Sequence, residues 1–131
     1  MSETKNAKDL KGKTGLHRLI NACGYSRDGF LAAYRHEEAF RQEFWLVIAA
    51  LVIAVLLPIS VLQAGILVAC HLFLLTVEIL NSAIEATVDR IGTEIHPLSK
   101  RAKDMGSCAV ALAGAICLIA WICILWDLLF A

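Results

Sequence analysis

Three carboxylates and an amide fall on one helical face near the middle of the chain. At about 100° per residue of α-helix, Glu78, Asn81, Glu85 and Asp89 lie within roughly 80° of one another. The residues between them are mainly apolar, and the stripe closes a long uncharged run. Carboxylates at membrane depth are costly, so they are usually paired, hydrated or functional. Any chemistry of this chain is therefore expected to centre on this stripe.

Hard oxygen ligands near a membrane edge suit phosphoryl transfer. Mg²⁺ prefers such ligands, keeps several waters and bridges phosphates, so Glu85 with Glu37 or Glu38 is a candidate magnesium site. Lys103 or Arg18 would neutralise phosphate oxygens. Phosphoryl transfer depends mainly on positioning and charge stabilisation, so it does not require a large soluble domain.

Glu78 lies deeper in the apolar run than the other carboxylates. It is the candidate general base, acting on a lipid hydroxyl. A small proton- or cation-coupled transporter would use the same carboxylate, and a purely structural subunit would use the stripe to hold its copies together. The transporter alternative does not explain why Lys103 and Asp104 should stand beside Glu85, and the structural alternative predicts that Glu78→Gln is harmless.

The composition predicts one integral membrane domain. The 131 residues are 59% hydrophobic, and the mean hydropathy is +0.69. No Asp, Glu, Lys or Arg occurs from Phe44 to Val77 or from Met105 to Trp126. A membrane span needs about 20 apolar residues, so these runs are too long for a soluble core. The net charge is zero, and nothing in the sequence indicates binding to nucleic acid.

The predicted architecture is all-α, with three transmembrane helices and an N-terminal surface helix. Apolar residues recur at helical spacing in the surface helix, where Gly24 and Gly29 are expected to interrupt. The uncharged run up to Val77 would be about 51 Å long as one helix, against a bilayer core of about 30 Å, so a turn is required near Pro58. The predicted segments are a disordered polar extension at 1–14 and a membrane domain at 15–131, with the surface helix at about 16–41 and spans at about 42–58, 64–91 and 103–128.

The basic residues are concentrated at one side of the predicted spans. All but four of the 12 lysines and arginines lie at or before Arg41, and those four lie between Arg90 and Lys103. The positive-inside rule therefore places the N-terminus and the loop at 90–104 in the cytoplasm. A single subunit is not expected to bury the whole stripe together with His71, which predicts a homo-oligomer.

The cysteines and His71 are interpreted as structural. The five cysteines form no CxxC pair, and most lie within predicted spans, which is typical of small apolar core residues with free thiols. No disulfide framework or metal–thiolate site is predicted. His71 shares the face of Glu78 and is interpreted as a packed, hydrogen-bonded residue.

Several motifs together resemble the prokaryotic diacylglycerol kinase family. They are Glu78-Ile-Leu-Asn-Ser-Ala-Ile-Glu85, Val88-Asp-Arg-Ile-Gly92 and Arg101-Ala-Lys-Asp-Met-Gly-Ser107, with Ala22-Cys-Gly-Tyr-Ser26 and Glu38-Ala-Phe-Arg-Gln-Glu43 nearer the N-terminus. The resemblance extends over roughly residues 15–128, and so many ordered positions are far more specific than one short motif.

The resemblance implies an activity and an assembly. It implies a homotrimer of three-span subunits in the bacterial inner membrane, with active sites shared between neighbours. The implied reaction is ATP-dependent phosphorylation of sn-1,2-diacylglycerol to phosphatidate in phospholipid recycling, with Mg²⁺ as cofactor. Undecaprenol kinases share the glutamate–asparagine–glutamate block and are the close alternative, but the match at the N-terminal motifs favours diacylglycerol.

The resemblance also implies roles for single residues. Glu78 resembles the general base, and Glu37 and Glu85 resemble the carboxylates that hold Mg²⁺ at the ATP phosphates. Nucleotide contacts are expected at Arg18, Tyr25, Glu37, Glu85, Glu94, His96, Lys103 and Asp104. Contacts with diacylglycerol are expected at Phe40, Phe44, Glu78, Asn81, Ser107 and Trp121.

Overall fold

The computed structural model describes residues 15–92 and 94–130, and these residues form four α-helices and no strand. In chain order the helices are α1 (Leu16–His36), α2 (Glu38–Leu56), α3 (Val61–Ile91) and α4 (Pro97–Phe130). The predicted all-α class is therefore confirmed. The predicted polar extension at 1–14 lies outside the described residues.

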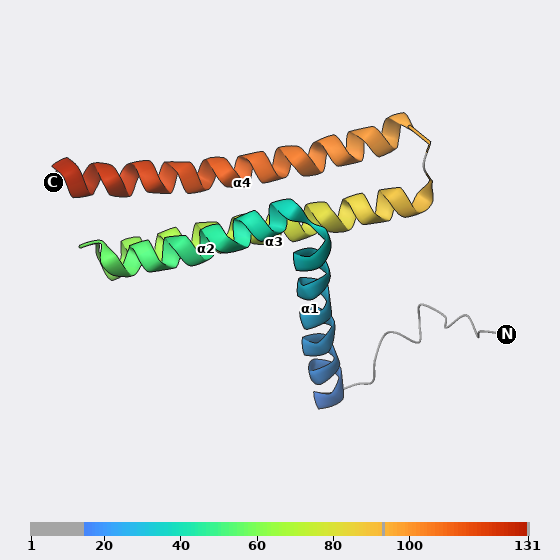
Figure 1. The fold of residues 1–131 in the computed structure, drawn as a ribbon, viewed down its shortest axis with the longest axis horizontal. Coiled ribbons are helices and arrows are strands. Elements are labelled where there is room, and N and C mark those ends of the chain that lie inside the picture. Colours follow the sequence, from blue (N-terminus) through green and yellow to red (C-terminus); the bar gives the residue numbers. More distant parts are fainter. Residues whose placement is uncertain (1–14, 93, 131) are drawn as a thin grey trace.

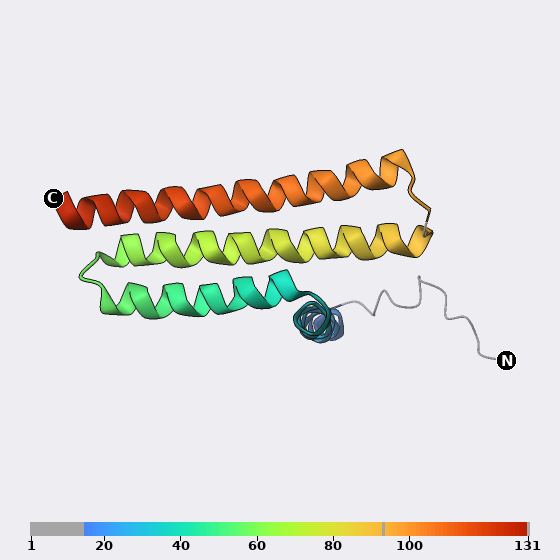
Figure 2. The ribbon, with the colours of Figure 1, turned by 45° about the horizontal axis from the view of Figure 1, so that its top comes forward.

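Three of the helices form an antiparallel bundle. Figure 2 shows α3 between α2 and α4, and α3 packs against both neighbours. The first helix lies across this bundle, so that Figure 2 shows α1 nearly end-on beside the start of α2. The central helix is thus the one that every other helix contacts.

The three bundled helices are long and apolar enough to cross a membrane. They contain 19, 31 and 34 residues, which correspond to about 28, 46 and 51 Å at 1.5 Å per residue. A bilayer core is about 30 Å thick, so α3 and α4 are long enough to extend beyond it. Their polar ends, joined by the loop between α3 and α4, are the parts that would protrude.

The boundary between α1 and α2 is set by Glu37. This residue has an extended backbone (φ −108°, ψ 115°), so residues 38–41 belong to α2 and not to the surface helix as expected. The Arg41 guanidinium donates hydrogen bonds of 3.1 and 3.2 Å to the carbonyls of Tyr34 and Arg35. These contacts satisfy carbonyl groups that the end of α1 leaves without helical partners.

The expected interruption of the surface helix does not occur. α1 runs without a break through Gly24 and Gly29. Glycine is able to adopt helical dihedral angles, at a cost of about 1 kcal/mol relative to alanine in a helix interior. Packing against the rest of the chain supports the helix near its C-terminal end, where Phe30 contacts the rings of Phe40 and Phe44.

Local capping explains where α3 and α4 begin. The Ser60 hydroxyl accepts a hydrogen bond from the Gln63 N–H at 3.2 Å, and the Gln63 side chain accepts one from the Ser60 N–H at 2.8 Å. The fourth helix begins at Pro97, earlier than the expected span, because proline suits the first position of a helix. The His96 ring supports this start by accepting a 3.2 Å hydrogen bond from the Leu98 N–H.

Candidate active site

Glu78 is buried within a single chain, with 5% of its surface exposed. It lies on the central helix α3, which is covered by α2 on one side and α4 on the other. His71, two turns earlier on the same helix, is also buried. Because α3 has a neighbour on both sides, one chain encloses these two residues, but, as expected, it does not bury the whole stripe. Asn81 and Glu85 are half-buried, and Asp89 is exposed.

Glu78 lies among groups of its own charge. The carboxylates that act on it electrostatically are, in order of strength, those of Glu43, Glu85 and Glu37. The ion pairs found in residues 15–92 and 94–130 join Arg27 to Asp28, Lys100 to Asp104 and Lys103 to Asp89. None of them includes Glu78, so this buried carboxylate has no ion-pair partner among the described residues.

Glu43 is the functional candidate that the sequence analysis missed. It is half-buried on α2, and it is the carboxylate with the largest electrostatic effect on Glu78. Its signal in the sequence was its position as the last charged residue before the uncharged run of the first span. Only the packing of α2 on α3 brings it close to the stripe.

Asn81 and Glu85 form a polar pair against α4. The Asn81 side-chain N–H group donates a 3.2 Å hydrogen bond to Glu85 Oε1. Among the described residues, Asn81 Oδ1 is the one buried side-chain polar atom without a hydrogen-bond partner. It lies against Gly106, where any Cβ atom would overlap it. Gly106 therefore permits the close approach of α4 to the stripe.

Two basic residues at the polar end of the bundle form exposed ion pairs. Lys103 Nζ on α4 lies 2.6 Å from Asp89 Oδ1 on α3, and Lys100 pairs with Asp104 one turn away on α4. The side chains of Lys103 and Asp89 are 38% and 66% exposed. Ion pairs this exposed contribute only about 0–1 kcal/mol, so Lys103 can exchange its partner for an anionic ligand at little cost.

The same end of the bundle contains a cavity between the end of α3 and the start of α4. Two hollows of about 260 and 530 Å³ share Gly92, Glu94, His96 and Ser99, and the smaller one is also lined by Asp89, Lys100 and Lys103. Four of the expected nucleotide contacts, Glu94, His96, Lys103 and Asp104, thus come from one end of the bundle, and three of them line this cavity. Asp104 is instead held in its ion pair with Lys100.

Other expected site residues lie elsewhere in the chain. Arg18 lines a separate hollow on α1 with Gly15, Leu19 and Ala22, and Tyr25 is an exposed residue of the same helix. Glu37 lines a mainly apolar groove of about 360 Å³ between α1 and α3. The α1 residues therefore do not complete the α3–α4 cavity of their own chain.

The expected lipid contacts have varied surroundings. Phe40 is completely buried in a core with Ala33, Val47 and Leu75, so in this chain it supports the junction of α1, α2 and α3. Phe44 is half-buried beside that core, and Ser107 is exposed on α4. The Trp121 indole N–H donates a 3.4 Å hydrogen bond to His71 Nε2.

The oxygen donors near the stripe are of the type that Mg²⁺ prefers. Within residues 15–92 and 94–130, no three carboxylates place their oxygens within 4.8 Å of one another. Mg²⁺ does not need such a cage, because it is usually held by one or two carboxylates together with waters and substrate phosphates. Glu37 and Glu85, the carboxylates expected to hold the ion, offer oxygen donors of this type and both act electrostatically on Glu78.

Comparisons with known proteins agree on one family. The family model described as prokaryotic diacylglycerol kinase matches residues 24–125. A diacylglycerol kinase of Pseudomonas aeruginosa is 52% identical over 116 residues, which cover 88% of this chain and 94% of the relative. A diacylglycerol kinase of Escherichia coli is 50% identical over 87% of this chain and 93% of its own length. One of Haemophilus influenzae is 42% identical, covering 82% and 92% respectively.

The contact between Gly106 and Asn81 predicts an effect on stability. Gly106→Ala should destabilise the protein by about 1–3 kcal/mol, because the added methyl group must displace the Asn81 side chain from a packed interface. Gly114→Ala on the same helix is the matched control, since nothing lies within 4 Å of its Cβ position. Thermal unfolding of both variants in detergent measures the difference. An equal midpoint for the two variants would contradict the close approach of α4 to Asn81.

Proposed function

The chain belongs to the prokaryotic diacylglycerol kinase family and is a lipid kinase, and from this premise we propose that it uses Glu78 to transfer the γ-phosphoryl group of ATP to sn-1,2-diacylglycerol. The product is phosphatidate, which returns diacylglycerol to phospholipid synthesis. The supporting observation is the buried, unneutralised carboxylate of Glu78 at the centre of the bundle. A carboxylate with no cation partner is free to accept a proton.

The proposed step has a simple balance of atoms. The Glu78 carboxylate accepts the proton of the primary hydroxyl of diacylglycerol. The hydroxyl oxygen forms a bond to the γ-phosphorus, and the bond from that phosphorus to the β–γ bridging oxygen breaks. ADP leaves with the bridging oxygen, and the proton on Glu78 later returns to solvent.

The polar end of the bundle supplies the binding groups for ATP in this proposal. Lys103 and Lys100 face the cavity between α3 and α4, and they would neutralise phosphate oxygens. Glu37 and Glu85 would hold Mg²⁺, which supplies charge neutralisation at the phosphates. Asn81 keeps Glu85 oriented through the hydrogen bond to Oε1.

The first helix is proposed to lie in the membrane interface. It lies across the bundle (Figures 1 and 2), and Leu16, Leu19 and Ile20 on it are 73%, 62% and 59% exposed. An amphipathic helix of this orientation buries such residues among lipid headgroups and acyl chains. The apolar groove between α1 and α3 then offers diacylglycerol a route from the bilayer to Glu37 and the stripe.

The active site is proposed to be completed by a neighbouring subunit of a homotrimer. Arg18 lies on α1 away from the α3–α4 cavity of its own chain, whereas the resemblance implies that it contacts the nucleotide. A neighbour's α1 resolves this difference. The charge distribution supports an inner-membrane orientation with the N-terminus and the α3–α4 loop in the cytoplasm, where ATP is present.

Phosphate transfer by the purified protein in mixed micelles tests the proposed reaction. With Mg²⁺ and labelled ATP, we expect label to appear in phosphatidate when diacylglycerol is offered, and little label when undecaprenol is offered instead. Removal of Mg²⁺ by a chelator should abolish transfer. Preference for undecaprenol would overturn the substrate, and transport of a solute or ion without ATP consumption would overturn the kinase mechanism.

The base assignment predicts a large effect at one position. Glu78→Gln keeps the size of the side chain but removes the proton acceptor, so kcat should fall by about 10²–10⁴-fold with little change in the KM for ATP. Asp28→Asn is the control, because Asp28 is an exposed carboxylate of α1 paired only with Arg27. Steady-state kinetics of folded, oligomeric variants provide the measurement. If Glu78→Gln turned over at the rate of Asp28→Asn, another group would have to be the base.

The nucleotide site predicts a different kinetic signature for Lys103. Loss of a charged hydrogen-bond donor is worth about 1.5–3 kcal/mol, so Lys103→Met should raise the KM for ATP by roughly 10–100-fold. Arg101→Met removes a charge two residues earlier on α4, at an exposed position that does not line the cavity. A similar KM in both variants would indicate that only net charge matters and that Lys103 does not contact ATP.

A further inference from the structure

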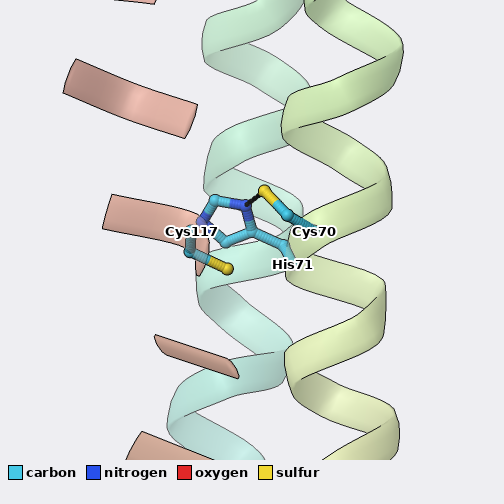
Figure 3. Close-up of side chains that lie close together, drawn as sticks. All are labelled: Cys70, His71 and Cys117. Carbon is cyan, nitrogen blue, oxygen red and sulfur yellow. Dashed lines mark hydrogen bonds between the residues drawn. The ribbon is translucent and has the colours of Figure 1, made fainter. Parts of the chain in front are cut away.

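A second set of ligand-type side chains lies apart from the carboxylate stripe. Cys70 and His71 on α3 and Cys117 on α4 place their ligand atoms within 4.8 Å of one another, and no other His, Cys, Asp or Glu cluster of three in the described part of the chain is this compact. All three residues are buried, with exposed fractions of 7%, 7% and 6%. Figure 3 shows them gathered in the space between the helices.

The hydrogen bonds of His71 leave one ring nitrogen suited to a metal. Nδ1 lies 2.8 Å from the Leu67 carbonyl oxygen, and because a carbonyl can only accept, Nδ1 carries the proton. Nε2 therefore carries the lone pair of the ring, which accepts a long 3.4 Å hydrogen bond from the Trp121 indole N–H. Metal-ligating histidines typically donate their other N–H group to a carbonyl or carboxylate, which fixes the ring and its tautomer.

The two thiols complete a soft donor set. Cys70 Sγ lies 3.8 Å from His71 Nδ1 and donates to the Leu67 carbonyl at 3.2 Å. Cys117 packs against Cys70 in the apolar contact between α3 and α4. Thiolates with an imidazole are the ligands that zinc and its heavier relatives prefer, whereas Mg²⁺ prefers oxygen.

We propose that Cys70 Sγ, Cys117 Sγ and His71 Nε2 bind one soft divalent cation, such as Zn²⁺ or Cd²⁺, between α3 and α4. Two thiolates, a neutral imidazole and a divalent cation have no net charge, and a neutral assembly is the kind that an apolar bundle tolerates. Binding releases one proton from each thiol to solvent and leaves a fourth coordination position for water or chloride. The site is distinct from the proposed Mg²⁺ site, since Glu85 lies about four helical turns beyond His71, or about 21 Å along α3.

Cadmium titration tests this site directly. Cys23, Cys108 and Cys123 are exposed, so the starting protein carries Cys23→Ser, Cys108→Ser and Cys123→Ser and retains only the two buried thiols. It is purified in detergent, reduced with a phosphine, freed of metal and shown to be folded by gel filtration and by phosphate transfer. Addition of Cd²⁺ should then produce near-ultraviolet thiolate-to-cadmium absorption that saturates at one cation per chain, with release of two protons per cation.

Single variants of this background identify the ligands. Cys70→Ser and Cys117→Ser should each abolish the absorption, and His71→Gln should weaken binding by at least about 10-fold. Cys117→Ala keeps an apolar residue in the helix contact and should abolish the absorption as completely as Cys117→Ser. An equal loss in both variants would show that the missing thiol, and not misfolding caused by a polar residue, is the cause. Trp121→Phe removes the N–H group that competes for Nε2, so it should preserve or strengthen binding.

Two results would overturn the proposal. One is the absence of thiolate-to-cadmium absorption in the folded background protein. The other is absorption that survives Cys70→Ser or Cys117→Ala, because the cation would then be held elsewhere. Either result would leave the three residues as an apolar helix contact, and neither depends on whether Glu78 is the base of the kinase reaction.

Discussion

The constraint on which the structure depends is the burial of the Glu78 carboxylate without a cation beside it. The basic side chains that form ion pairs with the stripe lie at the polar end of the bundle, where Lys103 contacts Asp89, while Glu78 lies deeper between α2 and α4. An apolar environment disfavours an isolated charge. Accepting a proton neutralises the carboxylate and so removes the cost of burying its charge.

Because α3 is the central helix, the polar side chains on one of its faces lie at successive depths and contact the helices on either side. Seven-residue and four-residue spacings place His71, Glu78, Asn81 and Glu85 on one face, from the interior to the polar end. Three of them have different neighbours on the flanking helices: Trp121 for His71, Glu43 for Glu78 and Gly106 for Asn81. A rigid helix thus fixes the relative heights of the groups, and the flanking helices determine what each group can do.

The sequence predicted the features that depend on local periodicity and hydropathy. The helical class, three apolar spans and the carboxylate face follow from such patterns. The extended backbone of Glu37 was not predictable, because the helix-forming residues on both sides conceal it. The burial of Phe40, the proximity of Glu43 to Glu78 and the meeting of Cys70 with Cys117 all require packing between helices. Cysteines this far apart in the sequence carry none of the spacing signals by which metal sites are recognised.

Two kinds of metal-ligand side chain lie at different depths along α3 and α4. Oxygen donors lie toward the polar end, where water and phosphates can complete the coordination of a hard cation that dehydrates reluctantly. Sulfur and imidazole donors lie in the buried part, where a cation must give up its water and where a site needs two anionic ligands to remain neutral. The two proposed sites would therefore select different cations through the same physical property, the decreasing access of water along one helix. A helix that runs from the membrane interior to its surface offers both environments without any additional domain.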